Sequence, residues 1–509
     1  MARHALTVTV PFACDFDRTS RDLGRQLAQA LRLAIRQGGL RSGDPLPSSR
    51  TLSKALGVSR GTVVEAFAQL VAEGFLESRQ GASTWVTRTT PDESPRAVTT
   101  RTTLPARRRA LPDSVAKFTR VAEQFVPLPG VPFAISVPAG ATAPGEAWRR
   151  LGNRLRARGP AAPAGYAETQ GVRELREHIA QYVRRARSVH CDADQIVVTS
   201  GTQQGLFLAA QVLVGPDDST WVENPAYPAL TAILTTTGRG SRMVRVPVDA
   251  EGLDVERGQA LAPEASVAFV TPSHQYPLGM PMSLRRRTAL LEWARRSGSW
   301  IVEDDYDSEM RYAGHPFPSM QGMDPDRVVY LGTFSKVLFP SLRLGYAVLP
   351  ADLVGPFVGA RILMDRHAPT ADQHVLAAFI GEGHLERHIR RLRGTYAAQR
   401  AHIVDVFQRV LPPALGRLQP CDQGMHMVVW LPDASDDLAV AAAALARGVA
   451  VRAVSPMYAK GTGRPGLLLG FGGYRPDDVE RAARRLAAVI KDGESRRGST
   501  RRQSRNVVG

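Results

Sequence analysis

A lysine in the middle of the chain has neighbours suited to a covalent cofactor site. The stretch YLGTFSKVLFPSLRLGY places Ser335 and Lys336 after an apolar run and Arg343 seven positions beyond the lysine. A neutral lysine amine at the edge of a pocket can form a Schiff base with a carbonyl compound. The planar fork of an arginine can hold a phosphate through two hydrogen bonds. Because most Ser-Lys pairs after a strand are simply solvated, the assignment depends on the rest of the chain.

Two further stretches predict strands that end in polar side chains. QIVVTSGTQQGL predicts a strand followed by a helix that begins at Thr202 and Gln203. The free amides and the dipole of a helix N-terminus bind anions. WIVEDDYDSE predicts a strand ending at Asp304, whose carboxylate can pair with the protonated nitrogen of a cofactor ring. Tyr306, two residues further on, can hydrogen-bond to a phenolic oxygen of the same ring.

The order of these stretches resembles that of fold type I pyridoxal-phosphate enzymes, over about residues 130–485. The resemblance implies that pyridoxal 5'-phosphate is attached to Lys336. It also implies a phosphate cup that begins at the SGTQQ helix terminus and is completed by Thr333, Ser335 and Arg343. Six such elements in the correct order make coincidence an unsatisfactory explanation.

Aromatic contacts to the cofactor follow from the same resemblance. Tyr227, in VENPAYPAL, corresponds to the residue that stacks on the pyridine ring. Tyr166, in AGYAETQGVREL, matches a position that in such dimers reaches the phosphate of the neighbouring subunit. The loop TPSHQYPLG resembles the one that reaches the phenolic oxygen, but Tyr276 replaces the usual asparagine before its proline. Any polar contact from this loop must therefore come from His274 or Gln275.

A second departure concerns substrate binding. Aminotransferases of this fold usually carry, three residues before a late aromatic, an arginine that holds the substrate carboxylate. Here GLLLGFGGY places Leu468 at that position relative to Phe471. Loss of a charge-assisted hydrogen bond costs about 1.5–3 kcal/mol. Arg464 or Arg452 can compensate from elsewhere, so the question stays open.

The first 88 residues predict three helices followed by two strands. SRDLGRQLAQALRLAIRQ places Leu23, Leu27, Leu31 and Ala34/Ile35 on one helical face with Ser20 as the candidate N-cap, and a short helix is expected from about Ser49. A third helix is expected to be capped by Ser59, with these apolar residues facing inward: Val63, Phe67, Leu70 and Val71. EGFLESRQGASTWVTR predicts two short strands around a turn at Gly81.

LPSSRTLSKALGVSRGTVVEAFAQLVAEGFLESRQG resembles the winged helix-turn-helix of the GntR family of bacterial regulators. In that motif the N-terminal residues of the recognition helix meet base edges and phosphates, and these are Ser59, Arg60, Gly61 and Thr62. Arg60 can contact a guanine edge or a phosphate, and Gly61 permits close approach of the backbone. Arg50 begins the preceding helix and is placed for a phosphate. In an isolated helix, Ser59 would be only an N-cap and Arg60 a solvated charge.

The fusion of these modules resembles the MocR-type subfamily of GntR regulators. It implies a winged helix-turn-helix at residues 12–88 and a fold type I aminotransferase-like domain at 130–490. The latter comprises a large doubly wound α/β domain and a smaller α+β lobe from about residue 360. Residues 89–129, rich in Thr, Pro and Arg, are expected to form a flexible linker, and basic residues 491–509 a disordered tail.

The resemblance further implies a head-to-tail homodimer in the cytoplasm that binds promoter DNA and senses a small amine or pyridoxal phosphate itself. Regulators of this kind respond to pyridoxal phosphate, to amines such as γ-aminobutyrate or to taurine, and no residue selects among them. An active aminotransferase with an appended DNA-binding module is the alternative interpretation. A dimeric scaffold that has lost its cofactor is disfavoured by the complete phosphate cup.

Composition agrees with a DNA-binding protein of several domains. The chain has 509 residues, 43% of them hydrophobic, and a formal net charge of +17. Residues 1–80, 81–130 and 491–509 each carry a net charge of +4, so a polyanionic partner is expected for the ends of the chain. No run of eighteen apolar residues and no secretory signal is found, and the three cysteines lack metal-ligand spacing.

Overall fold

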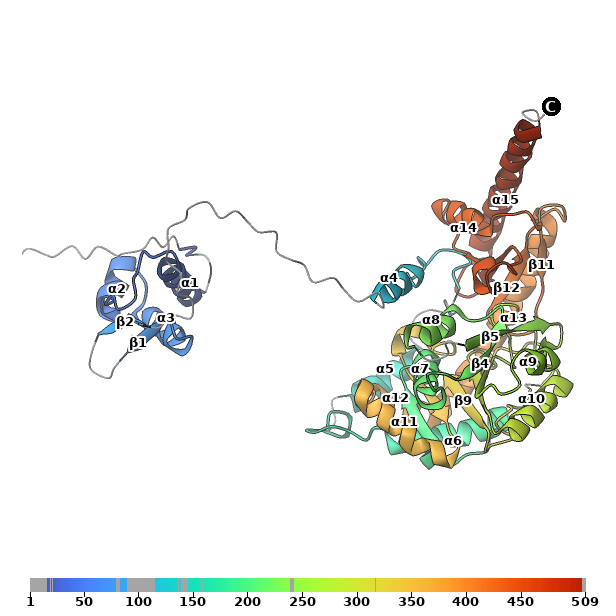
Figure 1. Cartoon of the computed structure of the whole chain (residues 1–509), viewed down its shortest axis with the longest axis horizontal. Helices are drawn as coiled ribbons and strands as arrows, with labels where there is room; N and C mark the ends of the chain where they lie inside the picture. Colours follow the sequence, from blue (N-terminus) through green and yellow to red (C-terminus); the bar gives the residue numbers. More distant parts are fainter. Residues whose placement is uncertain are drawn as a thin grey trace, which may run out of the picture. The chain divides into compact units, whose positions relative to one another are not determined.

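The structure is a computed structural model in which the chain divides into two compact units, Met1–Ala110 and Leu111–Gly509 (Figure 1). It describes residues 16–505, with the backbone alone from 496, and excludes the following positions: 19, 21, 79–82, 89–114, 136, 139–144, 157–158, 239–241 and 316.

The described part of the N-terminal unit is a helical core with an antiparallel β-hairpin. Its elements are α1 Leu23–Arg36, α2 Ser49–Leu56, α3 Arg60–Ala72, β1 Leu76–Ser78 and β2 Thr84–Val86. The buried residues Leu27, Leu31 and Leu52 pack with Val63 and Leu70 in one core. This arrangement confirms the predicted helix-turn-helix with two strands after it.

Two details of this unit differ from the expectation, and one lies outside the described residues. Ser20 is not the N-cap of α1: its hydroxyl accepts the amide of Asp22 (3.3 Å), and the helix begins at Leu23. Val71 is 38% exposed, because it lies about 100° around the helix from Leu70 and so leaves the inward stripe. The turn expected at Gly81 lies outside the described residues.

The larger unit is built on a mixed sheet whose described strands follow the order β3-β10-β9-β8-β7-β4-β5-β6. The central strands β9, β8, β7, β4 and β5 are parallel, while β10 and β6 run antiparallel to their neighbours. In that order the bounds are Ile196–Thr199, Gly345–Val348, Val328–Thr333, Trp300–Asp305, Val267–Val270, Ser219–Asn224, Arg242–Asp249 and Gly252–Leu253.

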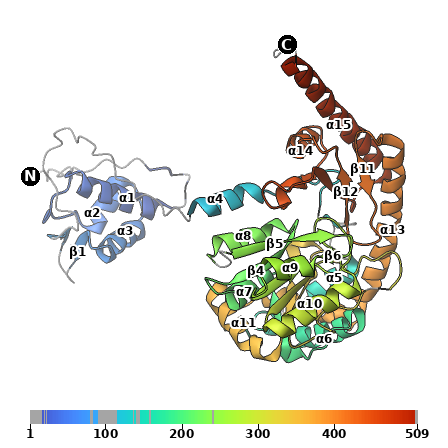
Figure 2. The same cartoon turned by 45° about the vertical axis from the view of Figure 1, so that its right-hand side comes forward.

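Helices cover both faces of this sheet (Figure 1; Figure 2). On one face lie α7 Thr202–Leu213, α8 Pro228–Thr236 and α11 Ala351–Met364. On the other lie α5 Glu146–Leu155, α6 Arg173–Arg187, α9 Val255–Leu261, α10 Leu284–Ser297 and α12 Thr370–Gly381. Adjacent strand residues alternate between the faces: Val302 packs with the first group and Ile301 with the second. This is the predicted doubly wound domain.

The smaller lobe is an antiparallel sheet in the order β11-β12-β14-β13, covered by long helices. Its elements are α13 His384–Val410, β11 Arg417–Gln419, β12 His426–Trp430, α14 Asp437–Ala446, β13 Arg452–Ala453, β14 Gly466–Gly470 and α15 Pro476–Arg505. The remaining elements of the unit are α4 Val115–Gln124 and the 3-10 turns η1 Gly159–Ala161, η2 Ala193–Gln195, η3 Pro340–Leu342 and η4 Ser455–Met457.

Three expected boundaries require correction. The stretch 89–129 contains a helix, α4, whose sequence has an amphipathic pattern despite the polar composition around it. The small lobe does not begin at about residue 360, because α11 and α12 pack against helices of the large domain. The tail from residue 491 continues α15 as far as Arg505. Because the helix is already formed and packed along its first half, each further residue that is ordered gains one backbone hydrogen bond without a new nucleation cost.

A buried ion pair joins the end of α6 to the end of β8. The side chains of Arg187 and Asp305 are 2% and 1% exposed, and Nε of Arg187 lies 2.8 Å from Oδ2 of Asp305. The other guanidinium nitrogens of Arg187 donate to the carbonyl of Phe317 (2.6 Å) and the hydroxyl of Ser273 (2.7 Å). Tyr330 donates to Asp305 at 2.6 Å. Removing one partner would leave a buried, uncompensated charge.

We therefore expect Arg187→Met to lower the free energy of unfolding by about 3–5 kcal/mol. Arg173→Met removes an arginine on the same helix whose side chain is 52% exposed, and should cost less than about 1 kcal/mol. Denaturant unfolding of both variants at one protein concentration measures the difference. Equal losses would contradict the assigned role of the buried pair.

Candidate functional site

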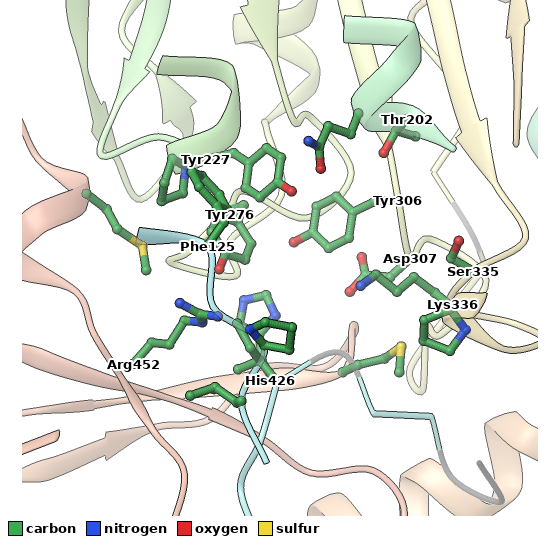
Figure 3. Close-up of a pocket in the computed structure, with 18 of the residues that line it drawn as sticks. Phe125, Thr202, Tyr227, Tyr276, Tyr306, Asp307, Ser335, Lys336, His426 and Arg452 are labelled. Atoms are coloured by element: carbon green, nitrogen blue, oxygen red, sulfur yellow. The ribbon is translucent and has the colours of Figure 1, made fainter. Parts of the chain in front are cut away.

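The carboxyl ends of the central strands open into a cavity of about 750 Å³ between the large domain and the small lobe (Figure 3). Nine of the ten residues predicted to contact the cofactor line it: Thr202, Gln203, Tyr227, Asp304, Tyr306, Thr333, Ser335, Lys336 and Arg343. Residues far apart in the sequence meet here because parallel strands bring their carboxyl ends to one edge of the sheet.

One side of the cavity is arranged to hold an anion. Gly201 has a φ of 96° and precedes α7, so the free amides of the helix terminus face the cavity beside Thr202. A Cβ on Gly201 would lie 3.5 Å from both terminal guanidinium nitrogens of Arg343, so glycine leaves room for an anion between the two. The buried hydroxyl oxygen of Ser335 has no hydrogen-bond partner among the described residues.

Asp304 presents a carboxylate that the described protein leaves partly unsatisfied. It lies at the end of β8 and is 7% exposed, and its Oδ1 has no hydrogen-bond partner among the described residues. Burial, together with the nearby carboxylates of Asp305 and Asp307, raises the pKa of Asp304 to about 7. A protonated ring nitrogen would satisfy this oxygen. Burial also lowers the pKa of the Lys336 ammonium, although Asp307 and Asp304 oppose that effect.

Tyr306 is held by a network that sequence reasoning found only in part. Its hydroxyl donates to the carbonyl of His274 at 3.0 Å and lies 3.1 Å from Nδ1 of the same residue. That Nδ1 lies 3.0 Å from the carboxylate of Asp307. Burial opposes protonation of the imidazole, but Asp307 outweighs it and raises the pKa of His274 to about 10. Asp307, the last acid of EDDYD, was not among the predicted site residues.

The side chain of Gln275 makes its hydrogen bonds to other residues of the protein. Its amide nitrogen donates to Glu223, to the carbonyl of Pro225 and to its own neighbour Tyr276, while its oxygen accepts the amide of Leu278. Of the two residues expected to replace the missing asparagine, only His274 therefore reaches Tyr306.

The small lobe places one of the two alternative arginines at the cavity. Leu468 is buried on β14 and packs against Leu278 and Val428. Arg452, on β13, is its partner across the two strands and lines the cavity. Arg464 is exposed and lies over the ring of Trp430, 4.2 Å from the centroid.

Tyr166 is the predicted cofactor contact that does not line the cavity of its own chain. Its side chain is 78% exposed, and the guanidinium of Arg366 lies 4.2 Å from its ring centroid. Within one chain it is therefore a surface residue.

The predicted DNA-contacting residues form the start of α3 and its surroundings. The Ser59 hydroxyl caps the helix by accepting the amide of Thr62 at 3.1 Å. Arg60, Gly61 and, on α2, Arg50 are exposed. The start of the helix is thus free to meet another surface, as a recognition helix requires.

A search of the described helices finds none that is long and apolar enough to cross a membrane.

Comparison with known proteins assigns both parts of the chain. Residues 130–486 match the family of aminotransferase class I and II, and residues 23–86 match that of bacterial regulatory proteins, gntR family. The probable rhizopine catabolism regulatory protein MocR of Rhizobium meliloti is 35% identical over 92% of this chain and 94% of its own length. The pyridoxine biosynthesis transcriptional regulator PdxR of Corynebacterium glutamicum is 35% identical over 92% of this chain and 95% of its own.

A solved kynurenine aminotransferase from Pyrococcus horikoshii covers 76% of this chain and 95% of its own, with 28% identity and a TM-score of 0.65. The predicted combination of a GntR helix-turn-helix with a fold type I aminotransferase-like domain is thereby confirmed. The chain belongs to the aminotransferase class I and II family and, through its N-terminal domain, to the MocR-type GntR transcriptional regulators.

Proposed function

We propose that this DNA-binding regulator carries pyridoxal phosphate on Lys336 and changes its interaction with promoter DNA when the cofactor pocket binds a small amine. The observation that carries the proposal is the pair of unsatisfied buried atoms in one cavity, Oδ1 of Asp304 and Oγ of Ser335. Unpartnered buried polar atoms are costly and are retained where a ligand satisfies them. A ring nitrogen and a phosphate oxygen are suitable partners.

Each side chain has a defined task in this proposal. Arg343 and the α7 terminus bind the phosphate, and Tyr227 packs on the ring. Asp304 holds the ring nitrogen protonated, and Tyr306 hydrogen-bonds to the phenolic oxygen. The bound cofactor supplies an aldehyde that combines with primary amines. An effector shifts regulation only if the two states of the protein bind it with different affinities.

Homodimerisation is part of the proposal. An apolar patch formed by Ile362, Leu363 and Met364 is 45%, 90% and 38% exposed at the end of α11. The exposed Tyr166 contacts Arg366, just beyond that patch. Such a patch suits a second copy of the chain, in which case Tyr166 would reach the phosphate of the neighbouring subunit.

An aminotransferase with an appended DNA-binding module is the second possibility, favoured by the completeness of the pocket. Incubating the protein with amino donors and an oxo-acid acceptor distinguishes the sensor from the active aminotransferase. Product in many-fold excess over protein would establish an enzyme, whereas product limited to one equivalent supports a sensor.

Lys336→Ala should abolish the visible absorbance of the bound cofactor, because no other side chain is proposed to attach it. Lys460→Ala, which changes a lysine outside the cavity, should leave the spectrum unaltered. An unchanged spectrum in Lys336→Ala would refute the attachment site.

Arg60→Ala should weaken binding to the promoter region of the protein's own gene by roughly 5- to 100-fold, as expected for loss of an arginine contact to a base edge. The exposed Arg25 on α1 provides the control, and Arg25→Ala should bind as the parent does. Both variants should keep their cofactor absorbance. Full promoter affinity in Arg60→Ala would exclude α3 as the recognition helix.

Leu363→Asp should convert the dimer to a monomer by placing a charge in the apolar patch, as measured by sedimentation velocity. Leu284→Asp changes another exposed leucine, 68% exposed on α10, and should leave the dimer intact. A dimer that survives Leu363→Asp would place the interface elsewhere.

A further inference from the structure

The small-lobe side of the cavity carries a cation whose surroundings are neutral. Arg452 lies across the cavity from Lys336 (Figure 3). The positive charge of its guanidinium lowers the pKa of the phenols of Tyr227 and Tyr276, against the larger effect of burial. Burial raises the pKa of Tyr227 to about 12 and moves that of Tyr276 further above its usual value, so both phenols are uncharged at neutral pH. This end of the cavity is therefore electrostatically suited to an anionic group.

The sheet register explains how Arg452 comes to this position. It stands directly opposite Leu468 in the antiparallel pair of β13 and β14. Residues directly opposite in such a pair project from the same face of the sheet. The resemblance to fold type I aminotransferases places Leu468 where such an enzyme would carry the arginine for the substrate carboxylate. The positive charge absent from β14 is thus present on the neighbouring strand, on the same face.

Arg452 also contacts the segment that leads toward the DNA-binding unit. Its Nη2 donates a hydrogen bond of 3.4 Å to the carbonyl of Val126. Residues 124–128, here called the linker strap, begin with the last residue of α4, and four of them line the cavity: Gln124, Phe125, Pro127 and Leu128. In the sequence, the strap and α4 lie on the side of the cavity-bearing unit that leads back toward the N-terminal unit.

The strap and α4 are lightly attached. None of the residues of α4 is buried, and Val126 is 60% exposed. Lys117 of α4 donates to the carbonyl of Thr235 on the large domain at 3.3 Å. Segments with few buried contacts open at low free energy, so the loss of one hydrogen bond can shift their position.

We propose that Arg452 selects amine effectors that carry an acid group and that its transfer from the Val126 carbonyl to that acid releases the linker strap. The proposal rests on the function proposed above, since it assigns the amine of the effector to the Lys336 end of the cavity. A guanidinium binds a carboxylate or sulfonate more strongly than a peptide carbonyl, because the hydrogen bond is then between charged groups. Binding of an effector in the cavity would thereby change the linker at its C-terminal end.

The first test compares two probes that differ only in the acid, 4-aminobutyrate and n-butylamine. Each is titrated into the full-length protein, and binding is followed through the absorbance of the bound cofactor. The parent should bind 4-aminobutyrate more tightly by roughly 10- to 100-fold, the range expected for one charge-assisted hydrogen bond. Arg452→Met should remove this ratio without changing the affinity for n-butylamine.

Two further variants make the result specific. Arg464→Met removes the exposed arginine that lies over Trp430 and should keep the full ratio. Arg452→Lys keeps the positive charge and should restore part of it. If the parent shows no preference for the acid, or Arg452→Met retains it, Arg452 is not the selector. Absence of cofactor absorbance in the parent would instead refute the function on which the proposal rests.

The second test measures hydrogen exchange in the peptide that spans residues 115–128. Exchange in the parent should become faster when 4-aminobutyrate is bound but not when n-butylamine is bound. In Arg452→Met it should already be fast without a ligand. Exchange that is equal in all of these states would contradict release of the strap, whatever the probe affinities show.

Discussion

The site depends on how a run of buried acids at the end of β8 is neutralised. Asp305 is paired with Arg187 from α6, and Asp307 is paired with the imidazole of His274. Asp304, directly before Asp305 in the sequence, lies at the cavity and has an oxygen, Oδ1, that receives no hydrogen bond from the described residues. Buried carboxylates without partners are costly, so Asp305 and Asp307 are compensated within the fold, whereas Asp304 is the acid that the proposed function assigns to a ligand.

This division of roles also sets the chemistry around the lysine. The carboxylates of Asp307 and Asp304 favour the charged form of Lys336, whereas burial lowers its pKa. The same His274 that neutralises Asp307 positions the hydroxyl of Tyr306 through its carbonyl. Residues that form structural ion pairs therefore also position the side chains that the proposed function assigns to the cofactor.

The feature that separates the proposed sensor from an aminotransferase lies in the small lobe. Leu468 belongs to an apolar cluster, and the nearby charge is supplied by Arg452 on the next strand. That shift moves the cation next to Val126, at the beginning of the unit that carries the pocket. In the proposal, the same arginine therefore serves both the effector and the linker strap, which is how a change in the cavity could reach that segment.

The sequence by itself determined the features that depend on neighbouring residues: the helix cap at Ser59, the strand that carries Asp304 near its end, and the spacing of Lys336 and Arg343. It could not decide which arginine faces the cavity, because that depends on the register between β13 and β14, which are separated by a loop. Nor could it show that the side chain of Gln275 is occupied by hydrogen bonds within the protein, since its partners Glu223 and Pro225 are distant in the sequence. Local spacing encodes local geometry, whereas contacts between distant segments exist only once the chain has packed.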